Sequence, residues 1–187
     1  AGSLPVDQIA EDVSHAWYAA TKSLEIPFEG STEPSLDNPA AYTWCKAPRL
    51  DGEVMEVGAL ARQVVAGHPL LRDLVQQGGG NVLSRVVARC LEIAQVVIAM
   101  ETWLAALVPG EPFITSAPSP ESGMAAGLTE AARGSLGHWL VVRDGRIASY
   151  QIVAPTTWNF SPRDAAGTPG ALEQALAGAP VRAGERE

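Results

Sequence analysis

Residues 137–153 read GHWLVVRDGRIASYQIV, two β-rich runs on either side of the dipeptide Asp144-Gly145. An Asp-Gly pair between such runs is a strong hairpin signal. Pro155 follows the second run and ends it, because proline cannot donate to a strand ladder. We therefore expect an antiparallel hairpin over about 138–153.

Upstream of the hairpin, residues 109–127 contain four prolines and are typical of a long loop. Before that loop, residues 81–107 read NVLSRVVARCLEIAQVVIAMETWLAAL, in which apolar residues recur every three or four positions. Asn81 is a suitable N-cap. The pattern predicts one long helix, and its broad apolar side predicts neighbours on more than one side. Shorter helices are expected at 56–65, 70–77 and 171–176, the first of them stopped by Gly67.

The N-terminal part of the chain has weaker patterns. Residues 7–20 have helix-like spacing, although an irregular segment is equally compatible with them. Residues 25–41 carry prolines and small polar residues and are predicted to form a second long loop. Residues 42–46 alternate as a strand that Pro48 would end, and Asp51-Gly52 predicts a turn.

The 187 residues are enough for one domain or two small ones, and the hydrophobic content of 47% argues against disorder. A formal charge of −8 argues against nucleic acid or an anionic membrane as the main partner. Charged residues interrupt the apolar stretch 82–108, so no membrane span is expected. The start of the chain does not resemble a signal peptide. Together with the cysteine usage, this favours a reducing, cytoplasmic location.

Two cysteines and three histidines are present, namely Cys45, Cys90, His15, His68 and His138. Their spacing fits neither a disulfide framework nor a recognisable set of metal ligands. A metal site built from this chain alone is therefore not expected.

Two segments stand out for their polar chemistry. In residues 127–139, Arg133 lies among small residues beside Gly134 and would be free to reach a cleft, with backbone approaching closely on either side. The alternative is an ordinary ion pair between Arg133 and a carboxylate. In residues 154–164, hydroxyls, an amide and the pair Arg163-Asp164 lie between prolines, which is also compatible with a simple hydrogen-bonded turn. Composition does not choose between these readings.

The order of several motifs resembles the C-terminal half of the large subunit of nickel-iron hydrogenases. The resemblance runs from about residue 7 to residue 181. It rests on the segments SHAWY (14–18), YTWCKAPR (42–49), MEVG (55–58), LAR (60–62), EAARGSLGHW (130–139), DGRI (144–147), PTTWN (155–159) and SPRD (161–164). The resemblance implies a mixed α/β (α+β) fold, with a helix bundle around the long central helix 81–107 and a small antiparallel sheet.

The resemblance also implies a nickel-iron centre with carbon monoxide and cyanide on the iron, held by four cysteines in two Cys-x-x-Cys pairs. Neither pair is present, so residues 1–187 are expected to be one segment of a larger subunit that carries both pairs elsewhere.

The positions that the resemblance assigns to the cleft wall lie in two segments. Arg133 would overhang the metals, and Thr156 would donate to one cyanide while backbone amides around Arg133 and Ala132 serve the other. Pro155 and Ala154 would wall the carbonyl ligand. The backbone carbonyl of Ile152 would bind a magnesium ion, although an ordinary strand carbonyl is nearly as compatible.

Three positions depart from the common family pattern. Ala132 stands where proline is common, Cys45 where the family has leucine or isoleucine, and Phe160 where it has alanine. These departures resemble the hydrogen-sensing, regulatory branch, which would imply H2 as substrate, an iron-sulfur small subunit and a sensor kinase as partners. An uptake respiratory hydrogenase, or a cysteine-less maturation scaffold, are the alternatives.

The remaining candidate residues have structural interpretations. Cys45 and Cys90 are expected to be buried thiols, and His15 and His138 to be hydrogen-bonded structural residues rather than proton relays. Lys46 is expected to pair with an acid such as Glu56, the alternative being a polar network next to the metal site.

Overall fold

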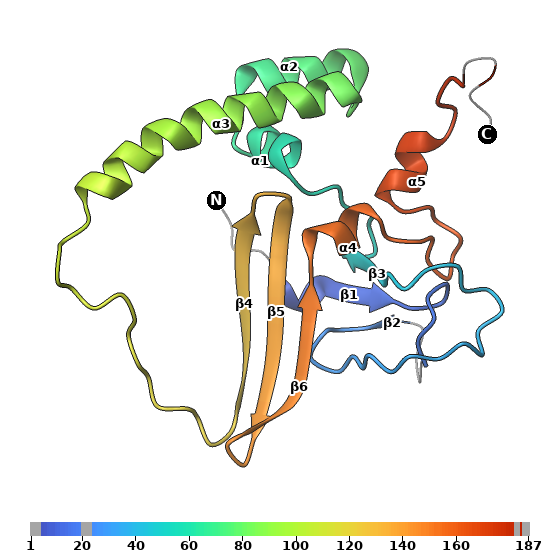
Figure 1. Ribbon diagram of the computed structural model, residues 1–187. Helices are drawn as coiled ribbons and strands as arrows, with labels where there is room; N and C mark the ends of the chain where they lie inside the picture. Colours follow the sequence, from blue (N-terminus) through green and yellow to red (C-terminus); the bar gives the residue numbers. More distant parts are fainter. Residues whose placement is uncertain (1–4, 20–23, 182–183, 185–187) are drawn as a thin grey trace.

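The computed structural model of the chain describes residues 5–19, 24–181 and Gly184. Three helices lie above two small antiparallel sheets in Figure 1. The first sheet has the strand order β2-β1-β3, and the second has the order β4-β5-β6. The strands are β1 (Ile9–Asp12), β2 (Leu24–Glu25), β3 (Ala47–Leu50), β4 (Gly123–Ala131), β5 (Gly134–Arg143) and β6 (Arg146–Val153). The helices are the 3-10 helix η1 (Val6–Gln8), α1 (Ala59–Val65), α2 (Pro69–Gly78), α3 (Val82–Ala105), α4 (Pro155–Asn159) and α5 (Ala171–Leu176).

The β5–β6 hairpin confirms the expectation from Asp144-Gly145. Arg143 pairs with Arg146 across a two-residue turn. Asp144 has φ 51° and Gly145 has φ 68°. Positive φ at both central residues matches the turn twist to that of the flanking strands. This turn is therefore specified by its own two residues.

Strand β4 replaces the last part of the expected 109–127 loop. It pairs antiparallel with β5 from Gly123 opposite Val142 to Ala131 opposite Gly134. Its residues are almost all exposed at the edge of the sheet. A strand of mostly small residues with no buried face has no apolar alternation to reveal it.

The N-terminal expectations need two corrections. The helix expected over 7–20 is wrong, because η1 is followed by the strand β1, whose Ile9 is buried. The strand expected over 42–46 begins instead at Ala47 and includes Pro48. Proline is tolerated there because β3 lies at the edge of its sheet, where a missing N–H breaks no ladder.

Helices α1, α2 and α3 pack around Ala59, Leu60, Leu71 and Ala88. Asn81 caps α3 as expected: its Oδ1 accepts from the Ser84 N–H at 3.0 Å, and Ser84 Oγ accepts from the Asn81 N–H at 2.9 Å. Helix α1 begins three residues later than expected, and Gly58, with φ 133°, is its N-cap residue.

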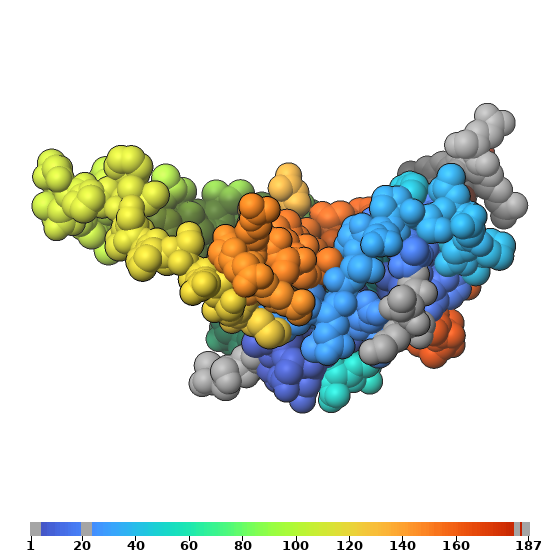
Figure 2. All heavy atoms as spheres, turned by 90° about the horizontal axis from the view of Figure 1, so that it is seen from below, coloured from blue at the N-terminus to red at the C-terminus, as the bar shows by residue number. Residues whose placement is uncertain are grey.

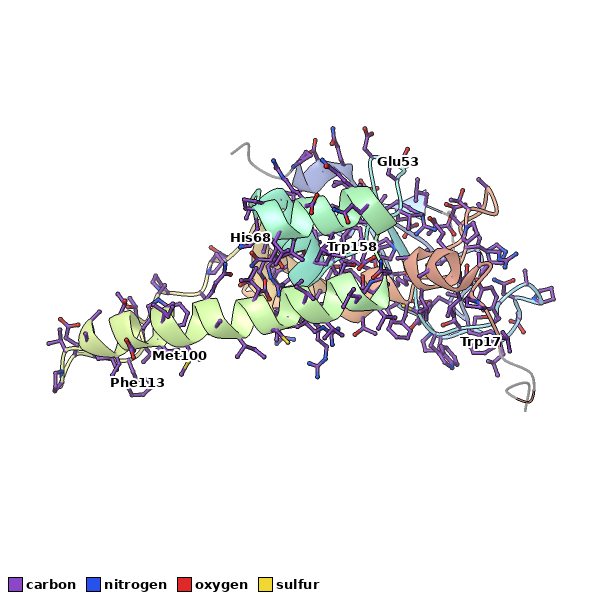
Figure 3. The ribbon with its side chains drawn as sticks, turned by 90° about the horizontal axis from the view of Figure 1, so that it is seen from above. Trp17, Glu53, His68, Met100, Phe113 and Trp158 are labelled. Carbon is purple, nitrogen blue, oxygen red and sulfur yellow. The ribbon has the colours of Figure 1, made fainter. Side chains whose placement is uncertain are left out.

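Only the first part of α3 is packed. Figure 3 shows Met100 and Phe113 at the far end of this helix, well away from Trp158 in the body of the molecule. The expected neighbours on more than one side of the helix are not found within the described chain. None of the helices in the described residues is both long and apolar enough to span a membrane.

A second core joins the two sheets. Ile9 of β1, Trp139 of β5, Val153 of β6 and Trp158 of α4 are buried together. Figure 2 shows the second sheet, in orange, lying directly beside the blue N-terminal segments. The mixed α+β expectation is confirmed, and α4 is held against both sheets at the top of β6 (Figure 1).

Candidate functional site

A pocket of about 320 Å³ opens where the turn between β4 and β5 meets α1, α3, α4 and α5. Ala132 and Arg133 of the turn and Thr156 of α4 line it. The structure thus brings together three of the residues that sequence reasoning placed at one cleft wall. Leu60, Phe160 and Leu172 contribute apolar surface, and Glu56, Arg85 and Arg89 contribute charge.

Arg133 is exposed to the pocket, and its side chain makes no hydrogen bond or ion pair with any other residue that the structure describes. The alternative reading, in which Arg133 pairs with a carboxylate of this chain, is therefore wrong for the described residues. A guanidinium carries five N–H donors. Those of Arg133 are available to a group in the pocket.

The backbone around Arg133 packs as closely as expected. Gly134 has φ 133°, and a Cβ added there would lie 2.6 Å from Val57 Cγ2 and 2.8 Å from the Gly58 nitrogen. Gly58 also has φ 133°, and its added Cβ would lie 3.2 Å from the Arg133 carbonyl oxygen. Two glycines therefore let the turn and the start of α1 touch backbone to backbone.

Asn159 joins α4 to the segment before α1. Its Oδ1 accepts from the Val57 N–H at 2.9 Å, and its Nδ2 donates to the Val57 carbonyl at 2.9 Å. The side-chain amide thus satisfies both backbone groups of one residue, in the way a neighbouring strand would. Asn159 itself lines the pocket, so this pair of bonds fixes two of its walls relative to each other.

Arg62 of α1 holds the end of β4. It binds both carboxylate oxygens of Glu92, at 2.8 and 2.7 Å, and one oxygen of Glu130 at 2.8 Å. It also donates to the carbonyls of Ala131 and Ala132, at 2.9 and 3.3 Å. Hydrogen bonds from Arg62 hold the pKa of Glu92 below its usual value, and the bonds to Glu92 raise the pKa of Arg62.

Glu56 and Lys46 form ion pairs with different partners. Glu56 forms a two-pronged pair with Arg85, with both N···O distances at 2.8 Å. Lys46 lies 3.6 Å from Glu11 and donates to Gln151 Oε1 at 3.1 Å. Lys46 thus pairs with an acid, as expected, but the acid is Glu11 and not Glu56. Burial raises the pKa of Glu11, although Lys46 acts in the opposite direction.

Ile152 lines a second pocket, of about 490 Å³, together with Glu11, Lys46 and Gln151. Carboxylate and amide oxygens are of the type that magnesium prefers. In the described chain, however, Gln151 Oε1 already accepts from Lys46 and, at 2.8 Å, from Thr32. The assignment of the Ile152 carbonyl to magnesium therefore stays a prediction.

The other residues assigned to the cleft wall lie close to Thr156. Ala154 precedes α4, and Pro155 is buried at its first position. Neither is among the residues lining the first pocket in the described part of the chain. Thr156 lines both pockets, and its hydroxyl makes no hydrogen bond to another described residue.

The two cysteines differ in their surroundings. The half-buried Cys45 thiol donates to the Thr157 carbonyl at 3.6 Å, and burial, helped by the charge of Glu11, raises its pKa to about 11. Cys90 is exposed on α3 in the described structure, so the expectation that it is buried is wrong. The reason is that α3 contacts its neighbours along one side only.

Two histidines expected to be structural have ring contacts. Nδ1 of His138 lies 2.6 Å from the Tyr150 hydroxyl, across the β5–β6 ladder. The His15 ring packs against Tyr42 with ring centroids 5.9 Å apart, and its Nδ1 is buried without a hydrogen-bond partner in the described chain. The structural role of His138 thus includes the expected hydrogen bond, whereas that of His15 does not show one at Nδ1.

The Arg163-Asp164 segment forms a hydrogen-bonded turn. Asp164 accepts from the N–H groups of Ala166 and Thr168 and from Arg49 Nε, the last at 3.1 Å. Arg49 is almost completely buried. Asp164 is thus paired with Arg49 and has a structural role.

The described residues can line a metal centre, but they do not supply its ligands. No three histidine, cysteine, aspartate or glutamate side chains in the described chain are grouped so that they could hold a metal ion. The pocket supplies instead the cation of Arg133 and the hydroxyl of Thr156, both without partners in the described chain. These groups fit a negatively charged or hydrogen-bond-accepting group held by ligands from elsewhere.

A family model described as nickel-dependent hydrogenase matches residues 2–187. The chain belongs to the nickel-dependent hydrogenase family. It is 35% identical to the uptake hydrogenase large subunit of Bradyrhizobium diazoefficiens, over 94% of this chain and 36% of that protein. It is 34% identical to the periplasmic [NiFeSe] hydrogenase large subunit of Desulfomicrobium baculatum, over 92% of this chain and 37% of that protein.

Solved structures agree with the family assignment. The reduced Ni-Fe-Se hydrogenase of Desulfovibrio vulgaris Hildenborough superposes with a TM-score of 0.83 and 37% identity, covering 94% of this chain and 40% of the other. The chain thus spans just over a third of the length of these curated relatives. The two curated relatives named above are an uptake and a periplasmic hydrogenase, and they do not identify a regulatory branch.

Proposed function

We propose that this chain forms part of the large subunit of a nickel-iron hydrogenase, which cleaves H2 heterolytically into protons and electrons. One observation carries the proposal: Arg133 lies without a partner in the described chain, in the same pocket as Thr156, on a turn that the surrounding structure holds in place. The family match supports the metal content, since nickel is in the description of the matching family.

The chain's own residues would act by positioning and by charge. The Arg133 guanidinium, a planar fork of donors at the pocket wall, would stabilise negative charge there and orient a proton acceptor. The Thr156 hydroxyl and the amides next to Arg133 would donate to cyanide ligands, which need hydrogen bonds when they are buried. Ala154 and Pro155, next to Thr156 in the chain, would exclude water beside a carbonyl ligand. The bound nickel-iron centre supplies the redox and Lewis-acid chemistry.

A magnesium ion bound next to Ile152 is also part of the proposed function. Its backbone carbonyl would be one ligand, and the other protein ligands would come from outside residues 1–187. The support for this role is the position of Ile152 in the lining of the second pocket.

The regulatory role belongs to the same proposal. The departures at Ala132, Cys45 and Phe160 favour a hydrogen sensor, located in the cytoplasm, that works with an iron-sulfur small subunit and signals to a sensor kinase. The names of the relatives favour a second candidate, an uptake hydrogenase. An export signal on the small-subunit gene would favour the uptake enzyme, and its absence would favour the sensor.

A cysteine-less maturation scaffold is the remaining candidate, because the 187 residues contain neither Cys-x-x-Cys pair. Reading the gene on both sides of this segment distinguishes it. Cysteine pairs in frame favour the enzyme, whereas stop codons favour the scaffold.

The direct test uses the full-length large subunit with its small subunit. Metal analysis should find nickel and iron, and infrared spectra should show bound carbon monoxide and cyanide. Arg133→Lys should keep the metals and lower H2 turnover about a hundredfold or more, because an ammonium cannot reproduce the donor fork. Arg143→Lys, at the other end of β5, is the control and should leave turnover unchanged. Unchanged turnover in Arg133→Lys would refute the role given to this arginine.

A further inference from the structure

The two turns of the second sheet are held in different ways. Asp144 and Gly145 both have positive φ, so the β5–β6 turn has the twist that its strands require. Ala132 and Arg133 form the other two-residue turn, between the paired residues Ala131 and Gly134. Among the described residues other than glycine, positive φ occurs only at Asp51 and Asp144.

The Arg133 turn is therefore not specified by the φ angles of its own two central residues. Two-residue hairpin turns that match the strand twist need positive φ at the first central residue or at both. Ala132 and Arg133 supply neither, and Gly134, with φ 133°, takes up the unusual backbone geometry. This turn therefore lacks the φ pattern that specifies the β5–β6 turn, and contacts from outside the hairpin can fix it.

Arg62 provides those contacts. Its Nη1 and Nη2 donate to two consecutive carbonyls, those of Ala131 and Ala132, which immediately precede Arg133. Glu92 anchors the same guanidinium on α3 through both carboxylate oxygens. The Arg62 side chain is only 23% exposed, so water competes weakly for these bonds.

We propose that Arg62 is a positioning residue for Arg133: it fixes the β4–β5 turn so that the Arg133 guanidinium is presented to the pocket. The catalytic consequence rests on the function proposed above for Arg133. The positioning itself rests only on the contacts of Arg62 with Glu92, Glu130 and the two carbonyls.

Lysine at position 62 should not replace arginine. The arginine makes five contacts in one plane, whereas an ammonium has three donors on a flexible stem. Arg85→Lys is the matched control, because Arg85 also lines the pocket wall and binds a glutamate through two nitrogens, yet its bonds go to Glu56 and not to the turn.

The experiment uses the full-length large subunit in complex with its small subunit. In Arg62→Lys, amide hydrogen exchange at residues 131–134 should rise about tenfold or more, since bonds to a charged donor are lost, while exchange elsewhere stays as in the parent. The infrared bands of the cyanide ligands should shift, because the amides of this turn are proposed to donate to one cyanide. Arg85→Lys should leave amide exchange at residues 131–134 as in the parent.

Three outcomes would overturn the inference. They are unchanged exchange at residues 131–134 in Arg62→Lys, a rise spread evenly over the whole subunit, and an equal local effect in Arg85→Lys. If Arg62→Lys does not accumulate, Glu130→Gln takes its place, and it should give a smaller rise confined to the same residues. No local rise in that variant would equally contradict the inference.

Failure of the proposed function would be seen separately. It would appear as unchanged turnover in Arg133→Lys, whereas the exchange measurement on Arg62→Lys does not depend on turnover.

Discussion

Replacing Asn159 with leucine should detach α4 from the segment that begins α1. The substitution keeps the approximate size of the side chain but removes two hydrogen bonds of 2.9 Å to the Val57 N–H and carbonyl. Each such bond is worth about 0.5–1.5 kcal/mol, and Asn159 is only partly buried, so the expected loss is about 2 kcal/mol in the free energy of unfolding. For a chain of this size, that corresponds to a fall in Tm of about 4–8 °C.

Urea and thermal denaturation of the 187-residue chain, followed by circular dichroism, measure this loss. Gln77→Leu is the control, because the Gln77 amide makes a single exposed bond of 2.8 Å, to Asp73 on the same helix. The control should cost less than about 0.5 kcal/mol. If Asn159→Leu is no more destabilising than Gln77→Leu, then the paired bonds to Val57 do not hold these two walls of the pocket together.

Two further predictions concern titratable groups. Iodoacetamide at pH 8 should label the exposed Cys90 and spare Cys45, whose pKa is raised to about 11 by burial; equal labelling, measured by mass spectrometry of peptides, would contradict this. Burial alone would raise the pKa of Asp164, but hydrogen bonds from the Thr168 N–H and from Arg49 outweigh it and leave the pKa below the ordinary 3.8. Asp164 therefore adds stability above that pH and loses it as the pH falls further, so Asp164→Asn should flatten the acid limb of the unfolding curve. A limb as steep as that of the parent would argue against this role of Asp164.

Sequence reasoning succeeded where a few adjacent residues decide the outcome. The Asp144-Gly145 turn follows from the φ preferences of two residues, and the start of α3 follows from the capping group of Asn81. The pairing of Arg133 with Thr156 in one pocket came from the resemblance to hydrogenases. The residues alone, without the resemblance, favoured an ordinary ion pair of Arg133.

The contacts that shape the pocket could not be predicted in the same way. Arg62 meets Glu92, 30 positions away, and Asn159 meets Val57, 102 positions away. Such pairs depend on how complete elements pack, and no local pattern marks them. Strand β4 was missed for a related reason, since a mostly exposed edge strand has no apolar alternation.

The different origins of the two turns also determine how this sheet can be engineered. In a library that varies Ala132 and Arg133, the backbone of the turn would still be held by Arg62 of α1. Position 62 should therefore be varied together with positions 132 and 133. The β5–β6 turn lies at the opposite end of the sheet from α1 (Figure 1), and its geometry is encoded by Asp144 and Gly145 themselves. A spectroscopic label attached beside this turn, with Asp144 and Gly145 kept, would therefore lie far from the pocket.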